Sequence, residues 1–333
     1  DVDFMRLVSD RPAPRYPNFI SDSPDAAVEK LIGREDDMKE LYTEIVENKG
    51  NLMISAVGGL GKTGLVKMFL NQLRDTESDV TGIEEIAWIP YNNQDFCLSV
   101  KQALHLQCDL DEVWQELRNR ATESGKKLLL VIDNIEHSEG DEYLRKLGFL
   151  QCRILVTSRQ KKLPGFGKVL YLQPMKMEGC RNLFYTHYQF SERDNEVVND
   201  IITLTAKLTI MIVFIAKVAY MEGMDLHELY ARLVEKGFKL SDEDVSCEHE
   251  KLHNDETIIR QMCILFSIVS YSYSDKILLT YISVIPNLQF DFSKARKWFG
   301  IKKNSNLLKL FSMGILEHTI KERRHIYWMH SVI

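Results

Sequence analysis

A glycine-rich turn between an apolar run and an amphipathic run constrains the fold of this chain more than any other feature. Residues 51–57 have the sequence NLMISAV, which indicates a buried parallel strand, and the apolar residues after the turn recur at helical spacing. Glycines at such a junction let successive backbone N–H groups point at a phosphate, and the dipole of the following helix adds positive potential. The residues of the turn are Gly58, Gly59, Leu60, Gly61, Lys62, Thr63 and Gly64.

The turn matches the phosphate-binding motif G-x-x-x-x-G-K-[ST] with one departure. In that motif the lysine reaches the outer phosphates and the hydroxyl residue binds Mg²⁺, so Lys62 is a candidate nucleotide ligand and Thr63 a candidate metal ligand. Ala56 stands where the motif has its first glycine, and because alanine is the smallest substitute we expect the turn to keep its shape. A flexible linker is the alternative, but a linker would not lie between a strand and an amphipathic helix. The turn therefore predicts binding of ATP or ADP with Mg²⁺.

A second apolar run ends in a carboxylate. Residues 126–134 have the sequence KKLLLVIDN, which is typical of a strand buried on both faces of a parallel sheet. Ligands bind at the carboxyl ends of such strands. Asp133 is therefore a candidate Mg²⁺ ligand and catalytic residue, in preference to the alternative that it caps the next helix.

A third run, residues 152–159 with the sequence CRILVTSR, predicts another strand whose polar tip reaches the same edge. An arginine there can contact the γ-phosphate and detect whether it is present. Arg159 is thus a candidate catalytic residue, with a solvated surface arginine as the alternative.

With 333 residues the chain is long enough for two or three domains. Strands alternate with helices up to about residue 175, which predicts an α/β fold with a doubly wound parallel sheet. The chain then becomes helical, and it ends in helices followed by a basic hairpin, the pattern of a winged helix. We expect a lead-in linker at 1–30, a P-loop nucleotide-binding domain at 31–175, an α-helical domain at 176–245 and a winged-helix domain at 246–333.

Charge and cysteine usage restrict the class of protein. The net charge of −6 gives no case for nucleic-acid binding by the whole chain, although residues 287–333 contain nine Lys and Arg against three Asp and Glu. The six cysteines form no C-x-x-C pair, which favours reduced thiols in a cytoplasmic protein. The longest apolar run, residues 208–216, is too short to cross a membrane. The polar stretch 241–255 contains Cys247, His249 and His253 without zinc-site spacing, so we interpret it as a solvated linker.

Taken in order, the motifs resemble the STAND class of P-loop NTPases, specifically its NB-ARC-like group of immune receptors and apoptosis adaptors. Ile32, Gly33 and Arg34 are similar to its adenine-side motif, and Pro174 to the junction into its helical domain. Residues 327–331, YWMHS, resemble the Met-His-Asp motif of its winged helix, which implies that His330 contacts the β-phosphate of ADP. The other matching segments are 58–63, 128–133, 157–159 and 183–184.

The chain departs from the family pattern in three places. Asn134 occupies the position of a second acidic residue, and an amide cannot accept a proton from water, so either hydrolysis is slow or Glu136 is the base. Ser331 replaces the last Asp of the Met-His-Asp motif. The segment Leu208–Ile210 replaces the family's Gly-x-Pro and is closer to a Thr-containing variant of prokaryotic members.

The resemblance implies a slow ATPase that works as a nucleotide-operated switch. With ADP the domains close, and a trigger favours exchange to ATP and assembly into oligomers that bring effector domains together. Because the chain starts without Met and ends abruptly at Ile333, we expect a piece of a longer polypeptide whose sensor and effector regions lie outside it. The resemblance points to innate immunity, with antiphage defence as the leading role. The alternatives are a STAND-type transcription regulator that binds DNA through its basic winged helix, and a metabolic ATPase or kinase.

Overall fold

The computed structural model describes residues 14–24, 32–91, 95–135, 142–191, 193–245, 252–269, 271–284, 289–301, 304–321 and 324–329. The chain forms two compact units. The sheet unit contains Asp36–Ser55 and Thr63–Leu170 together with the N-terminal segment. The helical unit contains Lys30–Glu35, Ala56–Lys62 and Tyr171–Ile333. Residues Ala56–Lys62 of the phosphate loop thus belong to the helical unit. The strand before the loop and nearly all of the helix after it belong to the sheet unit.

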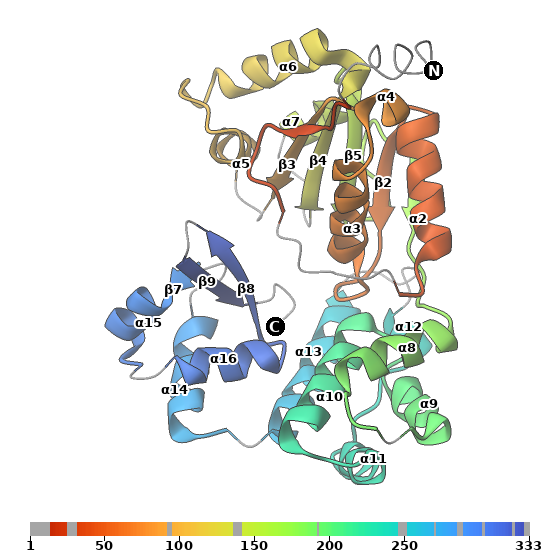
Figure 1. The fold of residues 1–333 in the computed structure, drawn as a ribbon, viewed down its shortest axis with the longest axis vertical. Coiled ribbons are helices and arrows are strands. Elements are labelled where there is room, and N and C mark those ends of the chain that lie inside the picture. Colours follow the sequence, from red (N-terminus) through yellow and green to blue (C-terminus); the bar gives the residue numbers. More distant parts are fainter. Residues whose placement is uncertain are drawn as a thin grey trace, which may run out of the picture. The chain divides into compact units, whose positions relative to one another are not determined.

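The sheet unit is built on six strands in the order β1-β3-β4-β5-β2-β6, and the pairs from β1 to β2 in this order are parallel (Figure 1). Strand β5 lies between β2 and β4, so the strand before the phosphate loop and the strand of Asp133 are not neighbours. The bounds are β1 Asn18–Phe19, β2 Asn51–Ser55, β3 Glu85–Pro90, β4 Leu128–Ile135, β5 Arg153–Ser158 and β6 Lys168–Tyr171.

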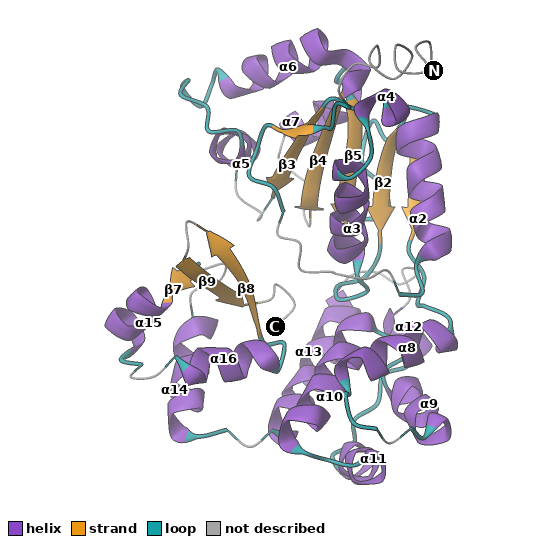
Figure 2. Cartoon of the chain, viewed as in Figure 1, coloured by secondary structure: helices purple, strands orange, loops and turns teal. Residues whose placement is uncertain are grey.

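Apolar runs form the central strands because both faces of the sheet are covered. Every residue of β5 is buried, and β4 is buried at all positions except Asn134. The helices of this unit are α2 Glu35–Tyr42, continued by a π-helical turn at Thr43–Glu47, then α3 Lys62–Arg74, α4 Ser78–Thr81, α5 Phe96–Ala103, α6 Val113–Ser124 and α7 Glu142–Lys146, with 3₁₀ turns at Gly125–Lys127 and Leu147–Phe149. Figure 2 shows these helices beside the sheet.

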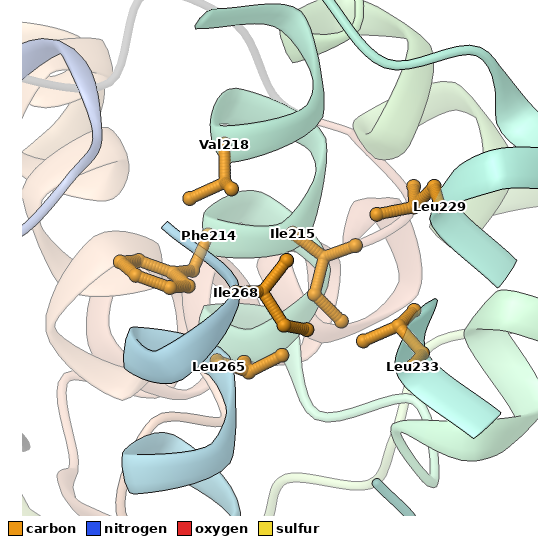
Figure 3. A pocket seen from close by; sticks show the side chains of 7 residues that line it. All are labelled: Phe214, Ile215, Val218, Leu229, Leu233, Leu265 and Ile268. Atoms are coloured by element: carbon orange, nitrogen blue, oxygen red, sulfur yellow. The ribbon is translucent and has the colours of Figure 1, made fainter. Parts of the chain in front are cut away.

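The helical unit begins with four helices whose apolar faces pack together. They are α8 Met177–His187, α9 Asn195–Leu204, α10 Thr209–Glu222 and α11 Leu226–Glu235, followed by α12 Asp242–Val245 and α13 Leu252–Ile268. Helix α10 is the most apolar and has seven buried residues. A small hollow between α10, α11 and α13 is lined by Phe214, Ile215, Val218, Leu229, Leu233, Leu265 and Ile268 (Figure 3). None of these side chains is polar, so the hollow belongs to the apolar core and offers nothing to orient a nucleotide.

The C-terminal part of the helical unit has the element order of a winged helix. Helix α14 Tyr273–Ser283, strand β7 Phe290–Asp291, helices α15 Phe292–Phe299 and α16 Ser305–Ser312, and strands β8 Leu316–Lys321 and β9 Arg324–Met329 follow one another. The three strands form an antiparallel sheet in the order β7-β9-β8. The buried Asp275 connects α14 to α16, because its carboxylate accepts hydrogen bonds from Asn306 at 2.8 Å and Lys309 at 3.3 Å.

The predicted fold class, an α/β parallel sheet followed by a helical region and a small antiparallel sheet, is confirmed. Two short strands differ from the sequence-based prediction. They form at Asn18–Phe19, inside the predicted lead-in, and at Phe290–Asp291.

The stretch 241–255, which the sequence predicts to be a solvated linker, is partly helical. Helix α12 forms there because Ser241 and Asp244 cap each other, with both Ser241 N and Ser241 Oγ 2.7 Å from the Asp244 carboxylate. Helix α13 also begins inside this stretch, at Leu252. Cys247 and His249 lie outside the described residues.

None of the helices in the described ranges combines the length with the apolar character that a membrane-spanning helix needs.

A half-buried histidine predicts a pH-dependent stability in the helical unit. Burial, and secondarily the positive charge of Lys217, lowers the pKa of His187 from 6.5 to about 4, while Glu317 faces Lys217. The folded state therefore disfavours the protonated ring, and this stability is fully present above pH 6.5 and is lost as the pH falls towards 4. After allowing for solvent screening we expect a loss on the order of 1 kcal/mol, or about 2–4 °C in Tm.

Thermal unfolding followed by circular dichroism at pH 7 and pH 4.5 measures this loss. His187→Gln cannot titrate, so its Tm should fall less than that of the wild type over the same interval. An equal fall in both proteins would contradict the assignment.

Candidate functional site

The phosphate loop requires glycine at two positions. Gly59 and Gly61 have φ angles of +79° and +103°, in a region that residues with a side chain rarely adopt. A Cβ at Gly59 would lie 2.4 Å from Cγ2 of Ile210, so the loop backbone also rests directly on the first turn of α10. Gly58 is buried and Gly64 half-buried. The glycines therefore serve both the turn and its close contact with the helical unit.

Lys62 is folded back over the loop. Its side chain is 7% exposed, and its ammonium donates to the carbonyl oxygens of Ala56 at 2.8 Å and Val57 at 3.0 Å. Both acceptors lie directly before the glycine turn that a phosphate chain would follow. An ammonium held there can exchange a carbonyl partner for a phosphate oxygen through rotation of its own side chain.

Arg34 and Thr209 both contact the loop at one carbonyl oxygen. The Leu60 oxygen accepts from Arg34 Nη2 at 2.9 Å and from Thr209 Oγ1 at 3.0 Å. Arg34 also donates to the oxygen of Gln173 at 2.5 Å, and Gln173 is followed by the half-buried Pro174. Gly33, next to the half-buried Ile32, has a φ angle of +66° and approaches Gly179 so closely that an added Cβ would lie 2.9 Å from its Cα. These contacts join the predicted adenine-side residues to the loop and to α8.

In the sheet unit the predicted metal ligands lie together. Thr63 Oγ1 donates to the Asp133 carboxylate, with its two oxygens at 2.9 and 3.1 Å. Asp133 is 7% exposed and also accepts from Thr157 Oγ1 at 2.6 Å. It lies inside β4, which continues to Ile135, so the helix-cap alternative for Asp133 is wrong.

The donor set of this cluster fits Mg²⁺. Mg²⁺ prefers oxygen ligands and is usually bound through one or two carboxylates, with waters and substrate phosphates completing the shell. Thr63 and Asp133 supply one hydroxyl and one carboxylate, and the described residues contain no group of three or more His, Cys, Asp or Glu that could hold a metal alone. When bound, the ion would neutralise charge on phosphate oxygens, and Thr63 and Asp133 are the residues that would hold it.

Of the other positions that the sequence analysis singles out, Asn134 and Arg159 lie among the described residues and Glu136 and His330 do not. Asn134 has a φ angle of +70° and its backbone N–H donates to Thr157 Oγ1 at 2.8 Å, so Thr157 connects two consecutive residues of β4 to β5. Arg159 follows the last residue of β5 and is half-buried, so it is not a fully solvated surface arginine. Glu136 and His330 lie outside the described residues, and the structure does not bear on them.

Solved structures with a related fold exist although their sequences are distant. A STAND protein with a tetratricopeptide repeat sensor from Pyrococcus horikoshii matches with a TM-score of 0.58 and 15% identity, over 94% of this chain and 43% of that one. The chain therefore has a fold related to that of this STAND protein, with an α/β parallel sheet followed by a helical region and a small antiparallel sheet. At this identity the likeness establishes the fold alone and not an activity, and the chain spans less than half the length of that STAND protein.

Two further matches are weaker. The ORC1 protein of Aeropyrum pernix, solved in complex with DNA, has a TM-score of 0.47 and 12% identity over 92% of this chain and 91% of that one. A Walker-type ATPase of Pyrococcus abyssi has a TM-score of 0.47 and 15% identity over 94% of this chain and 98% of that one. No protein-family model and no curated protein matches the chain.

The contacts of three polar residues in this fold are not predicted from the sequence. From the sequence, Thr157 is only part of a strand tip, Thr209 is only a departure from a family motif, and Arg34 is assigned to the adenine. Polar side chains at the end of an apolar run are the available signal for Thr157. No pattern in the sequence points to the Leu60 oxygen as the shared partner of Arg34 and Thr209.

Proposed function

We propose that the chain binds ATP and ADP with Mg²⁺ and works as a slow, nucleotide-operated switch. The observation that carries the proposal is the contact of the Thr63 hydroxyl with the Asp133 carboxylate at 2.9 and 3.1 Å, directly after a glycine loop that contains a buried lysine. These residues are 70 positions apart in the sequence. A hydroxyl and a carboxylate that converge where an anion-binding turn ends are the two protein ligands that a phosphate-bound Mg²⁺ requires.

In this proposal different residues bind the phosphate chain, its outer charge and the metal ion. Backbone N–H groups of the loop hold the phosphate chain, Lys62 neutralises its outer charge, and Thr63 and Asp133 hold the metal ion. Arg159 is the candidate that distinguishes ATP from ADP at the γ-phosphate. A switch requires that ATP and ADP bind its two states with different affinities, and an arginine that contacts only the γ-phosphate supplies such a difference.

Asn134 leads us to expect slow hydrolysis, and a slow rate would favour a switch over a metabolic ATPase or kinase. Asn134 follows Asp133 in the strand, and a neutral amide neither accepts a proton from water nor activates it. A long-lived ATP state gives time for assembly. We infer that the ATP state self-associates and activates an attached effector in a signalling or antiphage role, as the STAND resemblance implies.

The exposed basic residues of α15 favour the alternative of a DNA-binding regulator, whereas the exposed apolar residues of α16 argue against it. Lys294, Arg296 and Lys297 of α15 are exposed and could contact DNA phosphates. In a helix-turn-helix the second helix reads the bases. Here that helix is α16, which exposes Leu308 at 46% and Phe311 at 36%, and its Lys309 is paired with Asp275. We therefore favour the switch, and absence of DNA binding by the whole chain at low salt would remove the alternative.

The nucleotide carried by the purified chain tests the proposal. We expect the denatured protein to release nearly one mole of ADP or ATP per mole of chain. Ion-exchange chromatography of the supernatant identifies and quantifies the released nucleotide. A chain that releases no nucleotide and binds neither ATP nor ADP at millimolar concentration in a calorimetric titration contradicts the proposal. Hydrolysis at more than about 1 s⁻¹ would contradict the switch and favour a metabolic enzyme.

A further inference from the structure

The Leu60 carbonyl oxygen is the point where two distant segments hold the phosphate loop. Arg34, just before α2, and Thr209, the first residue of α10, donate to it at 2.9 and 3.0 Å. A carbonyl oxygen has two lone pairs, so these two donors saturate it. Leu60 is 1% exposed and Arg34 is 8% exposed, so water competes little for these bonds.

The preceding carbonyl of the loop is held by the same helix. The backbone N–H of Ile210 donates to the oxygen of Gly59 at 3.0 Å. The first turn of α10 therefore binds two consecutive loop carbonyls, one through a side chain and one through its backbone. The short distance between an added Cβ at Gly59 and Ile210 shows that the loop could not rest there with a larger residue.

Peptide geometry connects these carbonyls to phosphate binding. In a planar trans peptide the C=O and the N–H of the next residue point in opposite directions. Holding the oxygens of Gly59 and Leu60 towards α10 and Arg34 therefore turns the N–H groups of Leu60 and Gly61 away from them. Those N–H groups are the ones that a phosphate-binding turn must present to its ligand.

We propose that Thr209 and Arg34 are positioning residues that fix the Leu60 peptide for phosphate binding and thereby couple nucleotide occupancy to the docking of α10. The inference rests on the proposed function and deepens it. A phosphate that accepts from the Gly61 N–H polarises this peptide and strengthens the hydrogen bonds at the Leu60 oxygen. Because coupling of binding free energies is reciprocal, a helix held firmly at Leu60 raises nucleotide affinity, and nucleotide holds the helix more firmly.

Thr209→Val tests the proposal because it removes the hydroxyl and keeps the branched shape. We expect affinity for ADP to fall about fivefold to tenfold, the effect of losing one part-buried hydrogen bond. Thr209→Ser retains the hydroxyl and should restore most of the affinity. The matched control is Thr203→Val in α9, whose exposed hydroxyl donates to the Asn199 oxygen at 2.8 Å and should leave affinity unchanged.

Hydrogen exchange supplies a readout that a merely structural role would not change. In the wild type we expect ADP to slow exchange of the amide of Ile210, and in Thr209→Val this nucleotide-dependent slowing should be largely lost. Arg34→Lys is a second variant, since an ammonium cannot span both of the arginine's carbonyl partners, and it should lower affinity in the same direction.

The outcomes separate this inference from the proposed function. If the wild type binds ADP, and Thr209→Val binds ADP with the same affinity and shows the same ADP-dependent protection of the Ile210 amide, the inference alone is overturned. A wild type that binds no nucleotide overturns the proposed function and the inference together. Equal weakening by Thr209→Val and Thr203→Val would also refute the specific role of Thr209.

Discussion

Lys62→Ala is expected to weaken binding of both ATP and ADP by about 100-fold or more, while the chain stays folded. Lys62 is 7% exposed and its ammonium lies within hydrogen-bond distance of the carbonyl oxygens of Ala56 and Val57, so its charge acts in a poorly solvated part of the chain. Hydrogen bonds to charged groups contribute about 1.5–3 kcal/mol each, and a lysine that reaches the outer phosphates makes such bonds to anionic oxygens. Loss of this charge leaves several negative oxygens without their cation.

Calorimetric titration with ADP and with ATP·Mg²⁺ measures the effect. Lys67→Ala is the matched control, because Lys67 lies in the same helix α3, five residues further on, and is half-buried. We expect this control to bind nucleotide with wild-type affinity. Circular dichroism should show the helical content of the wild type in both variants. Undiminished binding by Lys62→Ala would refute the assignment of the lysine.

The residues with local signatures can be predicted from sequence. Lys62 and Thr63 follow a glycine turn at fixed spacing, and Asp133 ends a run of five apolar residues, so strand, helix and site are legible within short windows. Parallel strands bring their carboxyl ends to one edge of a sheet, which is why the sequence alone predicts that Thr63 and Asp133 lie close together.

The residues that hold the loop from a distance cannot be predicted in this way. Arg34 and Leu60 are 26 positions apart, and Thr209 and Leu60 are 149 positions apart, so their contacts depend on tertiary packing. The strands at Asn18–Phe19 and Phe290–Asp291 have two residues each, which is too short for an alternating pattern. Their pairing comes from the strands beside them, β3 and β9.

Arg153 is a residue whose strand can be predicted from the sequence but whose long-range contacts cannot. It stands second in a run that otherwise predicts a buried strand, and the sequence indicates no acidic partner for it. In the structure it is 1% exposed, and its guanidinium donates to the oxygens of Ile45 at 3.2 Å, Thr81 at 2.9 Å and Gly82 at 2.8 Å. Burial lowers its pKa. A cation therefore holds together the carboxyl ends of the π-helical turn after α2 and of α4, where carbonyl oxygens lack helical partners.

Arg153→Met is expected to destabilise the sheet unit by about 3 kcal/mol. Methionine fills much of the same volume and removes the cost of burying a charge, which limits the loss. It leaves three carbonyl oxygens without this donor, and each unsatisfied buried group costs about 1–3 kcal/mol. The expected fall in Tm is about 6–12 °C for a unit of this size.

Thermal unfolding followed by circular dichroism measures this change, with Arg118→Met on the exposed face of α6 as the control of equal composition. Arg153→Lys should lie between the wild type and Arg153→Met, because an ammonium retains the charge but cannot reproduce the planar fork that spans three carbonyls. If Arg153→Met melted together with Arg118→Met, the three hydrogen bonds would contribute no net stability. The carboxyl ends of these two turns would then be held by the packing of buried side chains, since Ile45 and Thr81 are themselves buried.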